Sequence, residues 1–168
     1  RKTLPEGTPS VVLNSADYGV AQTRRRCIAG EGWEAIPTHD KQSWLSVIDA
    51  LPHLKDELFS HMDSGRADAK TTGINPKTGK KEGGSGKLYR ELDNPSYTIM
   101  SNPRKLVKEI ETKPKKIRSL TIEETLTLQG FNSNYDMSHA RTQKNRWTMI
   151  GNAVVPSVAK AIIGGIKQ

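Results

Sequence analysis

Short apolar runs alternate with long polar segments along this chain, and these runs mark where ordered elements are expected. Val11, Val12 and Leu13 form a run of the length of a buried strand. A second strand resumes over residues 26–29, after turn-forming residues at 14–17 and Gly19. Residues 11–30 are therefore predicted to form two short strands around a polar turn.

Two other stretches have the 3.6-residue period of an amphipathic helix. The first helix is expected over residues 43–51, capped by Ser43 and ended by Pro52. The second is the last helix of the chain, with Pro156 in its first turn. Their apolar positions are Trp44, Val47, Ile48 and Leu51 in the first helix, and Val155, Val158, Ala159, Ile162, Ile163 and Ile166 in the second.

A further helix is marked by its two ends. Thr121 and Glu124 have the spacing of a capping box, which predicts a helix that runs to Gln129 and stops at Gly130. Residues 132–146 are polar and are predicted to be a loop. Tyr97 to Met100 has the composition of a strand.

Residues 64–86 contain almost no apolar side chains and are rich in glycine, lysine and threonine. Composition leaves two interpretations open: a solvated, flexible loop, or a mobile arm that becomes ordered on a nucleic acid. On the second interpretation, basic residues in and beside this segment would contact phosphates or base edges. These residues are Arg66, Lys70, Lys77, Lys80, Lys81 and Lys87.

The surplus of basic residues in the whole chain points toward a polyanionic partner. Lys and Arg number 26 against 18 Asp and Glu, giving a formal charge of +8. Each phosphate that such cations neutralise releases condensed counterions. A diffuse basic field on a protein without a nucleic-acid partner is an equally open alternative. Hydrophobic residues make up 34%, which predicts a thin core and fits a chain that packs against something else.

Cys27 is the only cysteine of the chain. One cysteine cannot form an internal disulfide or a cysteine-based zinc site, so we expect no metal and a reducing compartment. Its place between Arg26 and Ile28 in a strand predicts a small, buried apolar side chain. No apolar run approaches the ~20 residues that are needed to cross a bilayer, so we expect a cytoplasmic protein without a membrane partner.

Three patches of sequence resemble, in the same order, the motifs of DNA cytosine-5 methyltransferases. A basic, variable segment separates the first patch from the second, as it does in that family. The patches are Gln22, Arg24 and Arg26, which match the QxRxR motif; residues 118–131, similar to the RxLTxxExxxLQGF signature; and residues 150–156, like the IGNAVPP segment. Residues 90–99 also resemble the approach to the Thr-Leu pair of the family's target recognition domain, with Ile99 in the Leu position.

The resemblance implies an α/β fold. It would consist of an incomplete Rossmann-like methyltransferase sheet, represented by a β-hairpin and the C-terminal helix, and a small target-recognition lobe of mixed short strands and loops. Residues 1–55 and 146–168 would then complete the catalytic domain. Residues 56–145 would form the recognition domain, including the basic loop at 64–86.

The resemblance also implies roles for the residues of the first patch. Arg26 would reach the flipped cytosine and its phosphate, because a guanidinium fork can hold two oxygens at once. Arg24 would orient this edge of the active site and the sugar-phosphate, and Gln22 would support the turn. Recognition of double-stranded DNA would involve Arg90 and Thr98 beside the basic residues of the loop.

Gly151, Asn152 and Ala153 would lie at the methionine end of S-adenosylmethionine, the cofactor that the resemblance implies. A backbone N–H and a side-chain amide can bind the carboxylate at that end. In such enzymes a Cys thiolate attacks C6 of a flipped cytosine, a protonated Glu contacts N3, and the cofactor gives its methyl group to C5.

The 168 residues contain no match to the family's Pro-Cys loop, its ENV-type segment or its Gly-rich cofactor loop, and Cys27 follows Arg26 rather than a proline. We therefore expect a chain that is inactive alone: the small subunit of a split prokaryotic or phage enzyme of the restriction–modification type, whose larger subunit carries the nucleophile. Two alternatives stay open. One is a fragment of a single-chain methyltransferase, and the other is a non-catalytic DNA-binding remnant.

Overall fold

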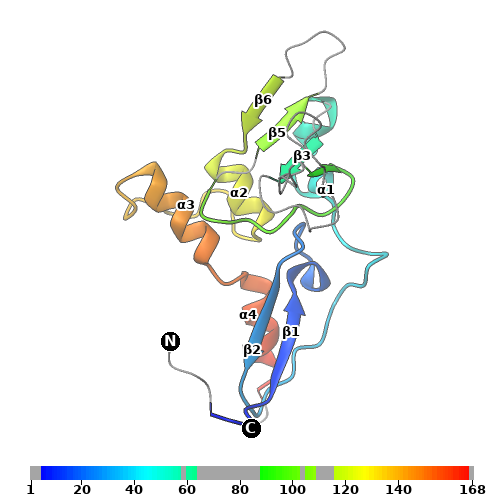
Figure 1. Ribbon diagram of the computed structural model, residues 1–168, viewed down its shortest axis with the longest axis vertical. Helices are drawn as coiled ribbons and strands as arrows, with labels where there is room; N and C mark the ends of the chain where they lie inside the picture. The colour runs from blue at the N-terminus through cyan, green and yellow to red at the C-terminus, as the bar shows by residue number, and fades with distance from the viewer. Residues whose placement is uncertain (1–4, 58–59, 64–87, 103–104, 109–115, 167–168) are drawn as a thin grey trace, which may run out of the picture.

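The structure is a computed structural model that describes residues 5–57, 60–63, 88–102, 105–108 and 116–166. Figure 1 shows a hairpin backed by the C-terminal helix in one part, and a small sheet with short helices in the other. A further helix, α3, projects to one side between them. The arrangement is mixed α/β, as expected from the sequence.

The hairpin is formed by β1 (Ser10–Asn14) and β2 (Arg25–Ala29), which pair antiparallel with Val12 opposite Cys27. A 3-10 turn, η1 (Ser15–Tyr18), leads out of β1 and ends at Gly19. Gly19 has a φ of 73°, and a Cβ there would lie 2.9 Å from the His39 ring, so both backbone and space favour glycine. The predicted strand–turn–strand unit is confirmed.

Helix α4 (Pro156–Gly164) packs on the hairpin and begins with proline at N1, as predicted. Together they bury a small core cluster of Leu13, Tyr18, Val20, Val155 and Val158. The end of the predicted stripe does not join this core, because Ile163 and Ile166 are 68% and 56% exposed. Ile163 belongs to α4 and Ile166 follows the end of the helix, and the described residues leave both side chains largely exposed.

A four-stranded antiparallel sheet with strand order β4-β3-β5-β6 forms the other part. None of its strands was predicted individually, because each has four residues, too few to show a period. Their bounds are β3 Ser60–Asp63, β4 Leu88–Glu91, β5 Lys105–Lys108 and β6 Lys116–Ser119.

Helix α1 (Val47–Ala50) begins later than predicted, so Ser43 as its cap is wrong. Ser43 instead hydrogen-bonds with the Asp40 carboxylate, 2.8 Å away, in the preceding turn. Ser46 is the cap, since its hydroxyl accepts from the Asp49 N–H while the Asp49 carboxylate accepts from the Ser46 N–H. Pro52 ends α1 as predicted and opens a second short turn, η2 (Pro52–Glu57).

Helix α2 (Ile122–Leu128) has the predicted capping box of Thr121 and Glu124, and Gly130 follows it with a φ of 83°. The predicted loop at 132–146 is partly wrong, because α3 (Gln143–Asn152) begins inside it. Its residues are mostly polar and lack an apolar stripe, so periodicity could not show it. The strand predicted at 97–100 is also wrong: Ser96 makes one isolated bridge to Gln22, and no ladder continues from it.

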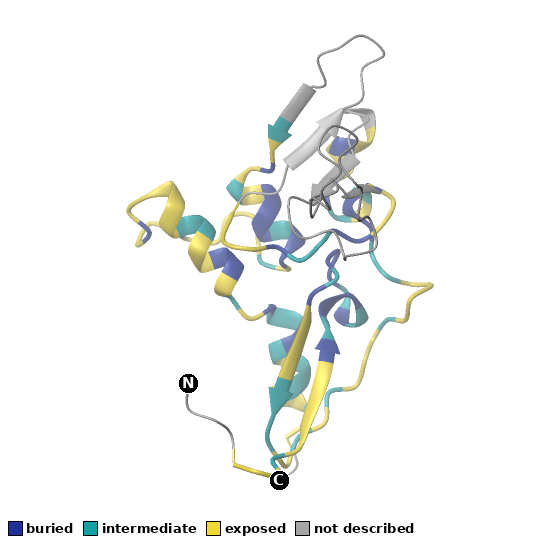
Figure 2. Ribbon diagram, viewed as in Figure 1, coloured by how far each residue is buried: buried dark blue, intermediate teal, exposed yellow. Residues whose placement is uncertain are grey.

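Figure 2 shows where the buried residues gather: under α2 and α1, and between the hairpin and α4. The larger cluster includes Leu54, Ile99, Leu120, Leu128 and Ile150, each at most 2% exposed. Much of β1, β2 and α3 is exposed on its outer surface. Both parts of the core therefore meet near the end of the hairpin that carries residues 20–24.

Glu124 connects three segments in the sheet-containing part. Its carboxylate accepts two hydrogen bonds from the Arg118 guanidinium, at 2.8 and 2.9 Å, and lies 2.8 Å from His53 Nε2. It also accepts from the Thr121 N–H. Burial alone would raise the pKa of Glu124, but these hydrogen bonds outweigh burial and lower the pKa from 4.5 to about 2.

Glu124→Gln is expected to lower the free energy of unfolding by about 2 kcal/mol at pH 7, because the amide keeps the shape of the capping box but loses the charge. The lowered pKa means that this stabilisation is fully present above pH 4.5 and is lost as the pH falls toward 2. Urea unfolding at pH 7 and pH 3 measures the difference. The exposed neighbour Glu123→Gln is the control, and an equal effect of both substitutions at pH 7 would contradict the prediction.

Candidate functional site

Gln22 is fully buried at the point where the two parts of the core meet. Its amide Nε2 donates to Gln129 Oε1 at 2.7 Å and to the Leu128 carbonyl at 3.4 Å, while its Oε1 accepts from the Ile99 N–H at 2.7 Å. One side chain thus joins the hairpin to α2 and to the extended segment after β4. These partners follow Gln22 by 77 to 107 positions along the chain.

Arg24 lies next to this amide and is 4% exposed. Its Nη1 donates to the Ile99 carbonyl at 2.7 Å, and its Nη2 donates to the carbonyls of Gly151 at 2.7 Å and Ala153 at 3.4 Å. Burial, with the positive charge of Arg26, lowers the pKa of Arg24 to about 10, so the side chain is still protonated at neutral pH. The planar fork reaches two chain segments at once, which an ammonium group cannot reproduce.

Gln129 completes the connection between the segments. Its Nε2 donates to the carbonyls of Ile150 and Ala153, at 3.2 and 3.3 Å. Gly151 packs so closely on the backbone of Met100 and Ser101 that a Cβ there would collide with it. All of the patches singled out in the sequence, including residues 90–99, therefore contribute to one buried hydrogen-bond network.

Beside this network lies a pocket of about 240 Å³ between β2 and the chain at 152–155. Arg24, Arg26, Asn152 and Ala153 all contribute to its lining. Apolar side chains supply much of the rest: Leu13, Ile28, Val154, Val155 and Val158. The pocket is open at one side and combines an apolar wall with a concentration of positive charge.

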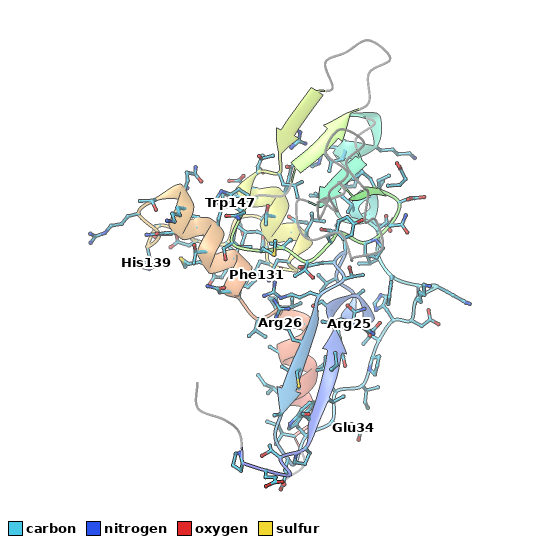
Figure 3. The ribbon with its side chains drawn as sticks, viewed as in Figure 1. Arg25, Arg26, Glu34, Phe131, His139 and Trp147 are labelled. Atoms are coloured by element: carbon cyan, nitrogen blue, oxygen red, sulfur yellow. The ribbon has the colours of Figure 1, made fainter. Side chains whose placement is uncertain are left out.

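Arg26 is exposed at this pocket, in contrast to Arg24. Its Nη1 donates only to the neighbouring Arg25 carbonyl, at 2.8 Å, within the part of the chain that the structure describes. Figure 3 shows Arg25 and Arg26 near the end of the hairpin that faces α2 and α3. Of these two arginines, only Arg26 lines the pocket.

The prediction that Cys27 is buried is wrong. Cys27 is exposed, is a free thiol and contributes to the pocket lining. Among the described residues, α4 is the helix that packs on the hairpin, and both Cys27 and its cross-strand partner Val12 stay exposed. A local sequence pattern could not reveal which face lacks a cover.

Asn152 and Ala153 differ in whether their polar groups are free to bind a ligand. The Ala153 N–H donates to the Ile150 carbonyl at 3.2 Å and so closes the end of α3. Asn152 is exposed, and its side-chain amide has no hydrogen-bond partner among the described residues. Within this segment the Asn152 side chain is therefore the polar group available to a ligand in the pocket.

The residues predicted to contact DNA fall into two sets. Thr98 is half-buried, and its hydroxyl donates to the Thr23 carbonyl at 2.8 Å, next to the network around Gln22. Arg90 belongs to β4. The others lie outside the described residues: Arg66, Lys70, Lys77, Lys80, Lys81 and Lys87.

Sequence reasoning assigned only a structural role to the helix that ends at Gln129, and it did not single out Gln129 itself. The order Leu128-Gln129-Gly130 within the matched motif could have pointed to Gln129. Its buried hydrogen bond with Gln22, 107 positions away, leaves no local pattern in the sequence. The described residues contain no group of His, Cys, Asp and Glu side chains suited to holding a metal ion. None of their helices is long and apolar enough to cross a membrane.

Comparison with known proteins gives a family match over most of the chain. The family model for C-5 cytosine-specific DNA methylase matches residues 8–168. Type II methyltransferase M.MthTI of Methanothermobacter thermautotrophicus is 26% identical over 182 residues. This similarity covers 94% of the present chain but 55% of the relative, so the chain spans about half the length of that protein.

Proposed function

The chain belongs to the C-5 cytosine-specific DNA methylase family, and from this membership we propose that it is the part of a DNA (cytosine-5)-methyltransferase that recognises the target and completes the active site. Its substrate is a cytosine in duplex DNA. The thiolate nucleophile and the Glu come from outside the 168 residues, on a larger partner chain. The continuation of the same chain in a longer enzyme is the alternative.

The observation that carries the proposal is the convergence around Gln22. Hydrogen bonds of Gln22, Arg24 and Gln129 join four distant segments beside the pocket, and Arg24 and Ala153 of this network also line it. A buried polar network of this kind fixes backbone positions, because each unsatisfied carbonyl or amide would cost free energy. We infer that the network positions the wall against which a flipped base is held.

Arg26 is the residue of this wall that touches the substrate. Its exposed guanidinium at the pocket can donate to O2 of the flipped cytosine and to the adjacent phosphate. Arg24 serves as a positioning residue, since its two terminal nitrogens already donate to backbone carbonyls. Its charge beside Arg26 adds to the positive potential that attracts the nucleotide.

The pocket residues also fit the methionine end of S-adenosylmethionine. When bound, this cofactor supplies the methyl group that is transferred to C5. The Asn152 side-chain amide can donate to the cofactor's carboxylate, and the apolar side chains of Val154 and Val155 exclude water beside it. The Ala153 N–H is not part of this proposal, because it closes α3.

The exposed surface of the hairpin supports the proposal that a second part of the enzyme covers it. A two-stranded sheet is marginal by itself, and within the described residues each of these strands has one unpaired edge. Apolar side chains are exposed on the hairpin and near it: Val12 of β1 is 59% exposed, and Val154, between α3 and α4, is 63% exposed. We propose that the catalytic part with the nucleophile pairs with this hairpin and covers that surface.

Mixing this chain with a candidate larger chain tests the proposal. Transfer of labelled methyl groups to duplex DNA should require both chains, and neither alone should give turnover. Activity of this chain by itself would overturn the proposal. A DNA-binding remnant would bind duplex DNA but give no methyl transfer with any cognate larger chain.

A further inference from the structure

The approach to α3 and its first turns carry positive charge on an exposed surface, and we call residues 138–149 the α3 arm. Figure 1 shows α3 projecting away from the hairpin and from the four-stranded sheet. Arg141 and Lys144 are exposed there, and Arg146 is half-buried with its Nε donating to the Ala140 carbonyl at 3.4 Å. The arm thus presents cations where little of the protein surrounds them.

No carboxylate in the described part of the chain forms an ion pair with Arg141 or Lys144. Asp136, the acidic residue nearest to the arm in sequence, is already engaged. Its carboxylate accepts from the Ser138 N–H at 2.8 Å and from the Ser138 hydroxyl at 3.1 Å. The charge of Arg141 and Lys144 is therefore available to an external anion.

One face of α3 connects the arm to the pocket. Lys144, Thr148 and Asn152 are spaced at i, i+4 and i+8, so they form one line along the helix, and all three are exposed. Asn152 lines the pocket that contains Arg26. The line from Lys144 to Asn152 is about 12 Å long at 1.5 Å per residue. A nucleic-acid strand advances about 3.4 Å per nucleotide, so this length corresponds to three or four nucleotides.

We propose that the α3 arm binds the phosphate backbone of duplex DNA three to four nucleotides from the base held in the pocket, through Arg141 and Lys144. The inference rests on the proposed function for the identity of its ligand. Charge complementarity selects DNA over a protein surface, because the exposed line on α3 consists of basic and hydrogen-bonding side chains. Such contacts carry no base information, so they strengthen binding to any sequence equally.

Fluorescence anisotropy with this chain and a labelled duplex provides the test, at several salt concentrations. Each phosphate contact contributes about 0.9 to the slope of log K against log salt concentration. The double variant Arg141→Gln/Lys144→Gln should therefore reduce the slope by about 1.8, equally on a target-containing and a scrambled duplex. The matched control Lys41→Gln/Lys160→Gln removes the same charge from exposed positions outside the arm and should leave the slope unchanged.

Equal slopes for the arm and control variants would overturn the inference. The proposed function would still stand in that case if binding depended on the target sequence and methyl transfer occurred with the larger chain. If the arm variant binds DNA normally but fails to assemble with the larger chain, the arm is a protein interface and the inference is also overturned. Lack of any duplex binding by the unaltered chain would overturn both. Thermal unfolding by circular dichroism should give the same midpoint for both double variants and the unaltered chain.

Discussion

Replacement of Arg24 by methionine is expected to lower the free energy of unfolding by about 3 kcal/mol. The substitution keeps an unbranched apolar stem but removes the donors to the carbonyls of Ile99 and Gly151, both 2.7 Å from the guanidinium. Arg24 is only 4% exposed in the folded protein, so little water can reach these carbonyls to replace the lost donors. Urea unfolding measures the loss. Gly151→Ala is a second probe of the same contact region.

Two controls separate the network from a general effect of charge. Arg25→Met removes the same group from the next residue, which is exposed, and should change stability by no more than about 0.5 kcal/mol. Arg24→Lys keeps the charge but cannot donate to both segments at once, so it should resemble Arg24→Met. If Arg24→Met unfolds at the same urea concentration as Arg25→Met, the buried network does not hold the segments together.

The parts of the fold that the sequence predicted well are those whose signals are local. The β1–β2 unit, the capping box of α2 and Pro156 at the start of α4 each depend on residues within a few positions of one another. Helix α3 and the four-stranded sheet escaped prediction for the opposite reason. Helix α3 has no apolar stripe to reveal it, and the strands are stabilised by pairing with distant neighbours.

In the candidate site, too, the features that depend on tertiary contacts could not be predicted from the sequence. The motif resemblance gave Gln22, Arg24 and Arg26 different roles, but it did not show that the first two are buried and the third is exposed. That distinction depends on the carbonyls of Ile99 and Gly151, which are brought to Arg24 only by tertiary folding. Cys27 shows the same limit, since a strand residue is buried or exposed according to what covers its face.

The division between Arg24 and Arg26 has a functional consequence. A guanidinium whose terminal nitrogens donate to the protein's own backbone is unavailable to a nucleotide, whereas Arg26 donates to one adjacent carbonyl and lines the pocket. Loss of Arg24 should therefore appear first as lost stability, and loss of Arg26 as lost turnover. Measuring both quantities for both positions tests this assignment directly.

If the chain completes a methyltransferase as proposed, Arg26→Ala is expected to reduce turnover of the assembled enzyme by at least about 100-fold, the usual cost of removing one preorganised donor from an active site. Binding of duplex DNA should weaken far less, because one phosphate contact is lost among many. Since Arg26 is exposed, the free energy of unfolding should stay within about 0.5 kcal/mol of that of the unaltered chain. Single-turnover methyl transfer and duplex binding are the two measurements.

Arg25→Ala is the matched control for this prediction, because it removes an exposed arginine from the opposite face of the same strand. It should leave turnover nearly unchanged. Arg26→Lys should restore duplex binding but not turnover, since an ammonium supplies the charge without the two-pronged geometry. A parallel fall of binding and turnover in Arg26→Ala would instead assign Arg26 to general DNA attraction, which is the behaviour of a non-catalytic binding module.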